Sequence, residues 1–393
     1  MATSAAAVPD EQVVIGEEIE HVRLITLNRP RQLNAISPEL VSLLAEYLEK
    51  WEKDDKADLI IIKGAGRAFS AGGDLRVFYD GRKTKDSCAE VVYRYFWLCY
   101  HINTYKKTQV ALVNGISMGG GSALMVQMNF SVVTEKTVFA TPEASFGYHT
   151  DCGFSYIHSH LPGHFGEFLA LTGARLNGKE LVAVGLATHF VSSEKIAELE
   201  ERLISLNSGD ENAVRSVIKE FSSEIKLNEE SILNKLSIID ESFSKDSVEE
   251  IIKSFEAEAN KEGNEWIGAY LKGMKRSSPT ALKIALRSVR EGRNQTLSEC
   301  LKKEFRLTMN MLRGTISGDM YEGIRALTID KDNAPKWEPP SLDRVDDEKL
   351  DLVFEQFQEN LELQIPEIDE CRWDGKYENS AYTVPHEAIP ISA

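Results

Sequence analysis

The sequence lacks several features that would point to common functions. No apolar run reaches the roughly 18–20 residues that a membrane-spanning helix needs, so no membrane partner is expected. Basic residues are outnumbered, 45 against 62 acidic ones, and the formal charge is −17. Broad nucleic-acid binding is not expected either, because it depends on Lys and Arg that neutralise phosphates. A small anionic ligand held by a local basic cluster is still compatible with this charge.

Cofactor and metal motifs are also missing. The five cysteines are scattered, with no C-x-x-C and no Cys/His spacing of a metal site, so we expect no metal and reduced thiols, as in an intracellular protein. Neither glycine-rich segment contains G-x-G-x-x-G or the Gly-Lys-Ser/Thr of a P-loop. A dinucleotide or a nucleoside triphosphate is therefore not expected.

We recognise no targeting signal in the first or the last residues of the sequence. The first residues, MATSAAAVPDEQVV, contain no Lys or Arg and no apolar core, unlike a signal or transit peptide. The last residues, Ile391 to Ala393, are not the S-K-L peroxisomal signal. By default we expect a cytoplasmic protein.

The first 200 residues alternate between strand and helix patterns. Residues 58–64 (DLIIIKG) are typical of a buried strand, and residues 37–53 of an amphipathic helix with Ser37 as N-cap and Pro38 at its first position. Strands that alternate with helices favour an α/β fold with both faces of the sheet covered.

The pattern changes after about residue 205. Amphipathic helices are expected over residues 246–259, 278–292 and 298–314, and we interpret their apolar stripes as core packing. From about residue 335 the chain is rich in proline and acidic residues, and an extended course over the surface is expected. We divide the chain into a core (10–205), a mostly α-helical C-terminal region (206–355) and an extended acidic tail (356–393).

Two glycine-rich junctions each follow a predicted strand: KGAGRAFSAGGDL at residues 63–75 and NGISMGGGSALMV at residues 114–126. Glycines that open a helix present free backbone N–H groups. One N–H from each junction, aimed at a single oxygen, would form an oxyanion hole. The alternative is that either junction is a tight turn or a close contact between helix and strand.

Two carboxylates stand in an apolar and aromatic stretch, ATPEASFGYHTDCGFSY, at residues 140–156. Apolar surroundings raise the pKa of a carboxyl group, so Glu143 or Asp151 could act as a base or nucleophile near neutral pH. A solvated loop is the alternative for each. His149 and Cys152 lie close by in the sequence; they could form a Cys–His pair, although a structural role for His149 fits better.

Five segments then identify a family. In order and spacing, the sequence resembles the crotonase (enoyl-CoA hydratase/isomerase) superfamily, and most closely the plant members of its 3-hydroxyisobutyryl-CoA hydrolase branch, in NRPRQLNAIS, KGAGRAFSAGGDLR, NGISMGGGSAL, FATPEASFGYHTDCG and LALTGARLNGKELVAVGLATHFV. The resemblance covers about residues 10–350. It implies a crotonase-like ββα spiral core that binds an acyl-CoA thioester.

The resemblance assigns roles to individual residues. The N–H groups of Gly73 and Gly120 would form the oxyanion hole, while Gly119 and Gly121 would serve the turn and the packing of the helix. Glu143 would activate water or attack the thioester. Asp151 would hold the 3-hydroxyl group of the substrate or assist proton transfer. The substrate-binding residues implied in this way are Leu33, Ala71, Gly72, Asp74, Tyr95, Gly120, Glu143 and Asp151.

The same resemblance implies the ligands and partners. CoA enters as part of the substrate, and no separate cofactor is implied. Arg29, Arg31, Lys275 and Arg276 are candidates for the CoA phosphates, with surface solubility as the alternative for each. The superfamily often forms trimers, so a homo-oligomer is compatible with the sequence. Relatives in this branch act in mitochondria or peroxisomes.

Two positions depart from the family pattern. Typical hydratases carry a second Glu where this chain has Ala123, which favours hydrolysis over hydration. Hydrolases outside plants tend to have an acidic residue near Tyr95, which leaves the acyl specificity open. The resemblance therefore predicts hydrolysis of 3-hydroxyisobutyryl-CoA, a step of valine catabolism. The alternatives are another crotonase reaction (hydratase, isomerase or decarboxylase) and a non-catalytic acyl-CoA-binding subunit.

Overall fold

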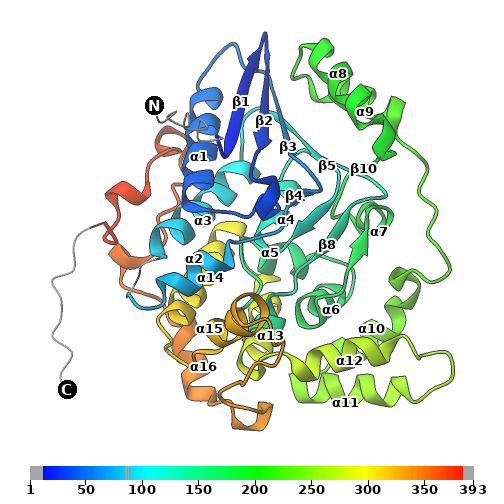
Figure 1. Ribbon diagram of the computed structural model, residues 1–393, viewed down its shortest axis with the longest axis vertical. Coiled ribbons are helices and arrows are strands. Elements are labelled where there is room, and N and C mark those ends of the chain that lie inside the picture. The colour runs from blue at the N-terminus through cyan, green and yellow to red at the C-terminus, as the bar shows by residue number, and fades with distance from the viewer. Residues whose placement is uncertain (1–11, 85, 87, 384–393) are drawn as a thin grey trace, which may run out of the picture.

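The computed structural model describes residues 12–84, 86 and 88–383 (Figure 1). The expectations about the first residues of the chain and about Ile391 to Ala393 concern termini that lie, wholly or nearly so, outside the described residues. Within the described part, no helix is both long and apolar enough to cross a membrane.

Two sheets form the N-terminal half. The larger sheet has the order β1-β2-β3-β5-β7-β10, and the smaller has the order β4-β6-β8-β9. All neighbouring strands are parallel except the pairs β1–β2 and β8–β9. The strands are β1 (Val14–Ile19), β2 (Val22–Leu27), β3 (Leu59–Gly64), β4 (Ala68–Ser70), β5 (Thr108–Val113), β6 (Ile116–Met118), β7 (Phe130–Val133), β8 (Val138–Ala140), β9 (Leu176–Asn177) and β10 (His189–Phe190).

Three successive turns, which begin with β3, β5 and β7, each contribute one strand to each sheet and then a helix, and this confirms the predicted ββα spiral. The helices of this half are α1 (Pro38–Glu52), α2 (Leu75–Gly81), α3 (Ala89–Asn103), α4 (Gly120–Val126), α5 (Phe154–Ser159), α6 (Phe165–Thr172) and α7 (Gly178–Val184). Because β4 and β6 pair in parallel, their carboxyl ends lie side by side. Both predicted glycine junctions therefore meet at one edge of the smaller sheet.

The predicted helix starts are confirmed. Ser37 caps α1 by accepting a hydrogen bond from the backbone N–H of Leu40, and Pro38 occupies the first turn. Ser278 and Pro279 repeat this arrangement at the start of α13 (Pro279–Gly292). A side-chain oxygen at the N-cap satisfies an otherwise unpaired N–H, which is why both helices begin at these residues.

The C-terminal half is mostly helical, as predicted. Its helices are α8 (Ile196–Leu206), α9 (Glu211–Phe221), α10 (Leu236–Phe243), α11 (Val248–Ala259), α12 (Ile267–Arg276), α13, α14 (Leu297–Leu312), α15 (Asp319–Ile324) and α16 (Asp347–Phe354). Helices α8 and α9 share a buried cluster with the large sheet, and in Figure 1 they lie at the opposite end of the molecule from α11 and α12. Helix α13 packs on α5 and α6, and α14 packs on α3.

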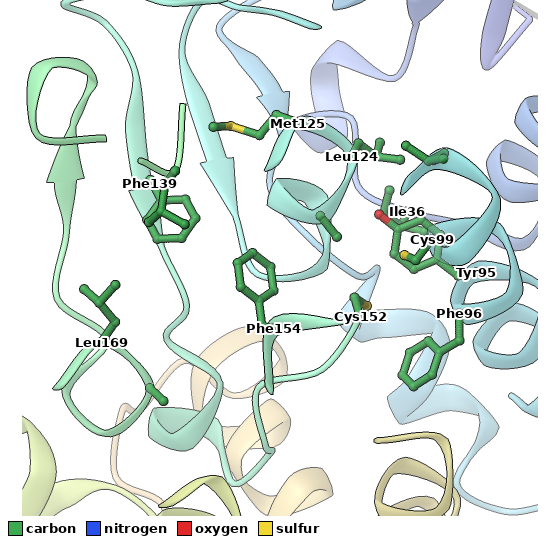
Figure 2. Packing of buried hydrophobic residues seen from close by; sticks show 14 of the residues in the cluster. Ile36, Tyr95, Phe96, Cys99, Leu124, Met125, Phe139, Cys152, Phe154 and Leu169 are labelled. Carbon is green, nitrogen blue, oxygen red and sulfur yellow. The ribbon is translucent and has the colours of Figure 1, made fainter. Parts of the chain in front are cut away.

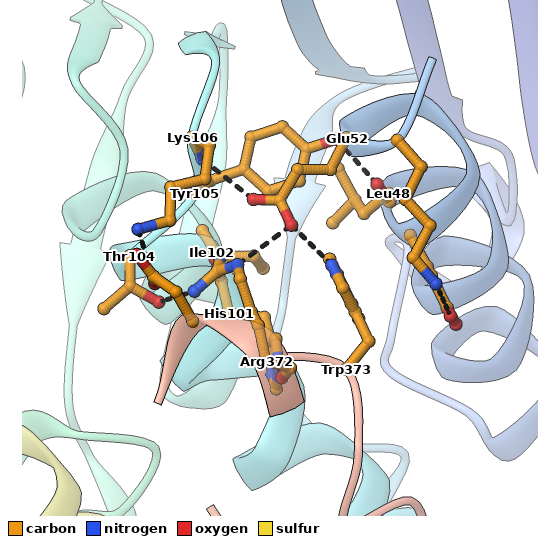
Figure 3. Close-up of polar contacts among 12 residues, drawn as sticks. Leu48, Glu52, His101, Ile102, Thr104, Tyr105, Lys106, Arg372 and Trp373 are labelled. Atoms are coloured by element: carbon orange, nitrogen blue, oxygen red, sulfur yellow. Dashed lines mark hydrogen bonds and ion pairs between the residues drawn. The ribbon is translucent and has the colours of Figure 1, made fainter. Parts of the chain in front are cut away.

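The final segment differs from the extended surface tail that the sequence predicts. Within its described part, Leu363 and Trp373 are buried in the main core. Figure 3 shows why the segment folds back: the carboxylate of Glu52 in α1 accepts hydrogen bonds from the Arg372 guanidinium, at 2.9 Å, and from the Trp373 indole. Trp373 packs against Trp97 and His101 of α3, whereas Ile368 of the same segment stays exposed.

We expect Glu52→Ala to lower the free energy of unfolding by about 3–5 kcal/mol, because it leaves the buried guanidinium of Arg372 without its carboxylate. Urea unfolding measures the loss. Lys376→Ala serves as the control, since it removes a partly exposed ion pair with Glu49 and should cost less than about 1 kcal/mol. Equal losses in the two variants would contradict this account of the anchor.

Candidate active site

A cavity of about 420 Å³ brings most of the predicted site residues together. Its walls include Ala71, Gly72, Gly73, Tyr95, Gly120, Glu143 and Asp151. The rest of the lining is largely apolar, with side chains such as Phe78, Phe96 and Met320, which suits an acyl chain.

Leu33 and Asp74 are not among the described residues that line this cavity. The carbonyl oxygen of Leu33 accepts a hydrogen bond from the Ala71 N–H and so holds the first glycine junction. The Asp74 side chain caps α2 and pairs with Arg29 at 3.1 Å. Direct contact of Leu33 or Asp74 with substrate stays a prediction.

The three consecutive glycines each have a separate reason. Gly119 adopts φ 50° and ψ −138°, and a Cβ atom there would lie 2.6 Å from Oε1 of Glu143. A Cβ at Gly121 would lie 2.5 Å from Ser70 Oγ, in the neighbouring strand end. Gly120 faces the cavity. Side chains at positions 119 and 121 would therefore push Glu143 away and separate the two junctions.

Two backbone donors border the cavity. Among the described residues, neither the Gly73 N–H nor the Gly120 N–H donates a hydrogen bond within the protein. The hydroxyl group of Tyr95, a residue of α3, donates a hydrogen bond to the Gly120 carbonyl oxygen at 2.6 Å. Tyr95 lies close to Cys99 and faces the Cys152 loop in Figure 2. Free donors beside a substrate-sized cavity can stabilise negative charge on a carbonyl oxygen.

Glu143 opens a short 3-10 helix, Glu143–Phe146, directly after β8. Its side chain is buried, and its Oε2 has no hydrogen-bond partner among the described residues. Burial, followed by the nearby Asp151 carboxylate, raises the pKa of Glu143 well above its ordinary value. An unpaired buried carboxylate is costly, and it is retained where a proton must be taken or given.

Asp151 lies on the loop before α5 and faces the same cavity. Burial raises its pKa to about 6, against the lowering effect of a hydrogen bond from the Tyr148 hydroxyl to Oδ2 at 2.8 Å. The site therefore contains two carboxyl groups that are both harder to ionise than usual.

One supporting residue could hardly be predicted from the sequence. Glu304 in α14 accepts hydrogen bonds from the backbone N–H groups of Gly153 and Ser155, at 2.6 and 2.7 Å, and fixes the loop that carries Asp151. Burial raises the pKa of Glu304 to about 7. Its only sequence signal is a carboxylate beside an apolar helical stripe, about 150 positions away from the loop that it holds.

A Cys–His pair is not formed. The ring nitrogens of His149 lie against the Thr150 carbonyl oxygen and the Thr308 hydroxyl rather than the Cys152 thiol. Burial also raises the pKa of Cys152 well above its usual range, so the reactive thiolate is disfavoured.

The predicted phosphate ligands are mostly engaged within the protein. Arg29 pairs with Asp74, Lys275 pairs with Glu256 at 2.5 Å, and Arg276 donates to the Asn333 carbonyl oxygen. Arg175 is an exposed cation in the lining of the cavity that sequence reasoning missed.

Comparisons with known proteins agree with this geometry. Residues 22–354 match the enoyl-CoA hydratase/isomerase family. The chain is 73% identical over 374 residues to 3-hydroxyisobutyryl-CoA hydrolase-like protein 5 of Arabidopsis thaliana, covering 95% of this chain and 97% of that protein. It is 42% identical to the mitochondrial 3-hydroxyisobutyryl-CoA hydrolase of Homo sapiens, covering 84% of this chain and 85% of that one.

Two further similarities differ in function. The small ribosomal subunit protein mS47 of Arabidopsis thaliana is 38% identical, covering 92% of this chain and 90% of that protein. The crystal structure of a carnitinyl-CoA dehydratase from Mycobacterium thermoresistibile superposes with a TM-score of 0.83 at 31% identity, covering 91% of this chain and all of that one. The chain belongs to the enoyl-CoA hydratase/isomerase family, as its sequence motifs predict. Relatives that are named as 3-hydroxyisobutyryl-CoA hydrolases, or as like them, are among the proteins that the chain is similar to.

We expect Gly119→Ala to lower the free energy of unfolding by about 1–3 kcal/mol, because its backbone conformation is one that side chains rarely adopt. The new methyl group should also displace Glu143. Chemical denaturation measures the first effect, and a crystal structure of the variant the second. Gly268→Ala is the matched control: it lies in α12 with open space around it, and should stabilise by about 0.5–1 kcal/mol. An unmoved Glu143 in the Gly119 variant would argue against this role.

Asp151→Asn should stabilise the protein at pH 7 and not at pH 3. The Asp151 carboxyl group ionises near pH 4 in an unfolded chain and near 6 in the folded protein, so the folded state binds more protons in between. The wild-type free energy of unfolding therefore falls as pH rises through this window, by roughly 2–3 kcal/mol. Unfolding at the two pH values tests this, and a variant that gains nothing at pH 7 would count against a raised pKa.

Proposed function

We propose that this chain hydrolyses the thioester of 3-hydroxyisobutyryl-CoA to 3-hydroxyisobutyrate and free CoA. The observation that carries the proposal is the buried Glu143 side chain, whose Oε2 has no partner among the described residues. Glu143 lines a cavity that is also bordered by two backbone N–H groups without partners in the described part of the chain. Relatives named for this hydrolysis support the substrate. Valine catabolism would follow from it. The reaction needs only water as second substrate, and we propose no separate cofactor.

In the proposed mechanism, the thioester oxygen accepts hydrogen bonds from the Gly73 and Gly120 N–H groups. Ionised Glu143 either removes a proton from the attacking water or attacks the carbonyl carbon itself, forming an anhydride that water cleaves. In both routes the C–S bond breaks, CoA leaves as the thiolate and is then protonated, and one water is consumed. Asp151 holds the 3-hydroxyl group of the acyl chain.

Hydrolysis fits these residues better than hydration of a double bond. Within the described lining, Glu143 and Asp151 are the carboxylates, and Ala123 lies fully buried in the core rather than adding a third. The similarity to mS47 favours a second candidate, a non-catalytic subunit on the same fold that binds acyl-CoA. The buried Glu143 in the cavity lining argues for the hydrolase.

Release of the CoA thiol, followed with a disulfide dye, tests the proposal. We expect rapid release from 3-hydroxyisobutyryl-CoA and little from acetyl-CoA or crotonyl-CoA. Glu143→Gln should reduce the rate by at least about 10²-fold, because it removes the base or nucleophile, whereas the exposed control Glu229→Gln should not. CoA binding without release from any of the three thioesters would reject hydrolysis and favour the subunit.

The cytoplasmic location and the homo-oligomer stay predictions. The human relative is named as mitochondrial, and a mitochondrial location is the alternative that it suggests for this chain. Size-exclusion chromatography with light scattering would measure the oligomeric state.

A further inference from the structure

Asp151 is the end of a buried chain of hydrogen bonds that the proposed mechanism does not use. The Tyr148 hydroxyl lies 2.8 Å from Asp151 Oδ2 and 2.6 Å from the Thr308 hydroxyl. Thr308 Oγ1 lies 2.9 Å from His149 Nε2, and His149 Nδ1 lies 3.1 Å from the Thr150 carbonyl oxygen. All four side chains in this series are buried. Three belong to the loop after Glu143, and Thr308 is supplied by α14.

The hydrogen-bond chain can run in only two directions, because each hydroxyl group and a neutral imidazole carry one polar hydrogen each. In the first direction, His149 donates to Thr308, Thr308 to Tyr148, and Tyr148 to the Asp151 carboxylate. His149 Nδ1 is then a bare acceptor that faces the Thr150 carbonyl oxygen, which is also an acceptor. Two buried acceptors that face each other are unfavourable.

The second direction pairs every group. Protonated Asp151 donates to Tyr148, Tyr148 to Thr308, Thr308 to His149 Nε2, and the His149 Nδ1–H donates to the Thr150 carbonyl oxygen. An ionised His149 does not provide a third arrangement, because burial, with a smaller contribution from the nearby Lys303, lowers the pKa of His149 to about 3. The direction of the chain and the protonation of Asp151 are therefore linked.

We propose that Tyr148, Thr308 and His149 form a hydrogen-bond chain that favours the protonated form of Asp151 over its carboxylate. Glu143 and Asp151 repel each other when both are charged. Glu143 therefore ionises more easily while Asp151 holds its proton than after Asp151 has become charged. The mechanistic consequence rests on the proposed hydrolase, whereas the link between the chain and Asp151 does not. Thr308 and His149 are positioning residues, since neither lines the cavity.

Other ionisable groups also face Asp151, and none of them is substituted in the variants described below. They are Glu143 from the short 3-10 helix, Tyr95 from α3, Glu304 from α14 and Cys152 on the same loop. A shift in the titration of Asp151 that accompanies a substitution of Thr308 is thus attributable to the hydrogen-bond chain.

Two variants should shift this titration in opposite directions. Thr308→Val removes the far partner of Tyr148, so the Tyr148 hydroxyl donates to Asp151 permanently and stabilises the carboxylate. We expect the Asp151 titration to move down by about one pH unit. Tyr148→Phe removes the donor to the carboxylate and should move the titration up by about as much. The carbonyl stretch of protonated Asp151, identified as the infrared band lost in Asp151→Asn, reports the titration without any turnover.

Thr280→Val is the matched control. Thr280 is equally buried, its hydroxyl has no partner among the described residues, and it lies in α13 outside the cavity lining. It should leave the titration unchanged, and Thr308→Ser should restore the wild-type value. If Thr308→Val fails to fold by circular dichroism, Thr308→Ala replaces it. An unshifted titration in the Thr308 variant, or shifts of the same sign at Thr308 and Tyr148, would overturn the proposal.

The pH profile of thiol release then tests the consequence. Because Asp151 becomes charged at a lower pH in Thr308→Val, Glu143 ionises against that charge over a wider pH range, so the acidic limb of kcat/KM should move to higher pH. If the acidic limb of the kcat/KM profile stays in place although the infrared titration of Asp151 has shifted, the hydrogen-bond chain does not affect the ionisation of Glu143. If the wild-type protein hydrolyses none of the thioesters, the proposed function fails. The infrared measurement still tests whether the hydrogen-bond chain controls the protonation of Asp151.

Discussion

The site depends on a close approach of two backbone segments that leaves no room for side chains. At the carboxyl ends of β4 and β6, a Cβ atom at Gly72 would lie 3.0 Å from the Met118 carbonyl oxygen, and one at Gly121 would lie 2.8 Å from the Gly72 nitrogen. The parallel pairing of β4 with β6 brings these segments together. Because Gly119 also has no side chain, the Glu143 carboxylate can occupy the space beside it.

A second constraint follows from burial. Glu143, Asp151 and Glu304 are all buried, and burial raises the pKa of each. Only Glu304 has its carboxylate satisfied by two backbone N–H groups, and it lies outside the cavity lining. Among these three, the oxygen without a partner in the described part of the chain belongs to Glu143, a residue of the cavity lining. Of these three carboxyl groups, the one that lacks hydrogen-bond partners thus lies where the proposed chemistry takes place, as is usual for active sites.

Much of this could be predicted from the sequence, because the relevant signals are local. N-caps such as Ser37 and Ser278 act within one helical turn, and the glycine junctions and Glu143 stand in short motifs. Glu304 and Thr308 could not be predicted, since they reach the loop at residues 147–155 only through the packing of α14. The surface tail was wrong for a related reason: its composition is acidic, but Leu363, Trp373 and the partner of Arg372 on α1 determine its position.

The C-terminal helices thus complete a site that the ββα spiral begins. Helix α14 supplies Glu304 and Thr308 to the loop that carries Asp151, while Tyr95 of α3 holds the carbonyl of Gly120. The proposed hydrolysis requires that the Gly73 and Gly120 N–H groups donate hydrogen bonds to the thioester oxygen while Glu143 faces the carbonyl carbon.

The most direct measurement is the infrared frequency of a ¹³C-labelled thioester carbonyl of 3-hydroxyisobutyryl-CoA bound to the Glu143→Gln variant. Two hydrogen bonds from the glycine N–H groups should lower the carbonyl stretching frequency below its value in water. A bound thioester whose carbonyl frequency equals or exceeds that value would contradict the oxyanion hole, and with it the proposed mechanism.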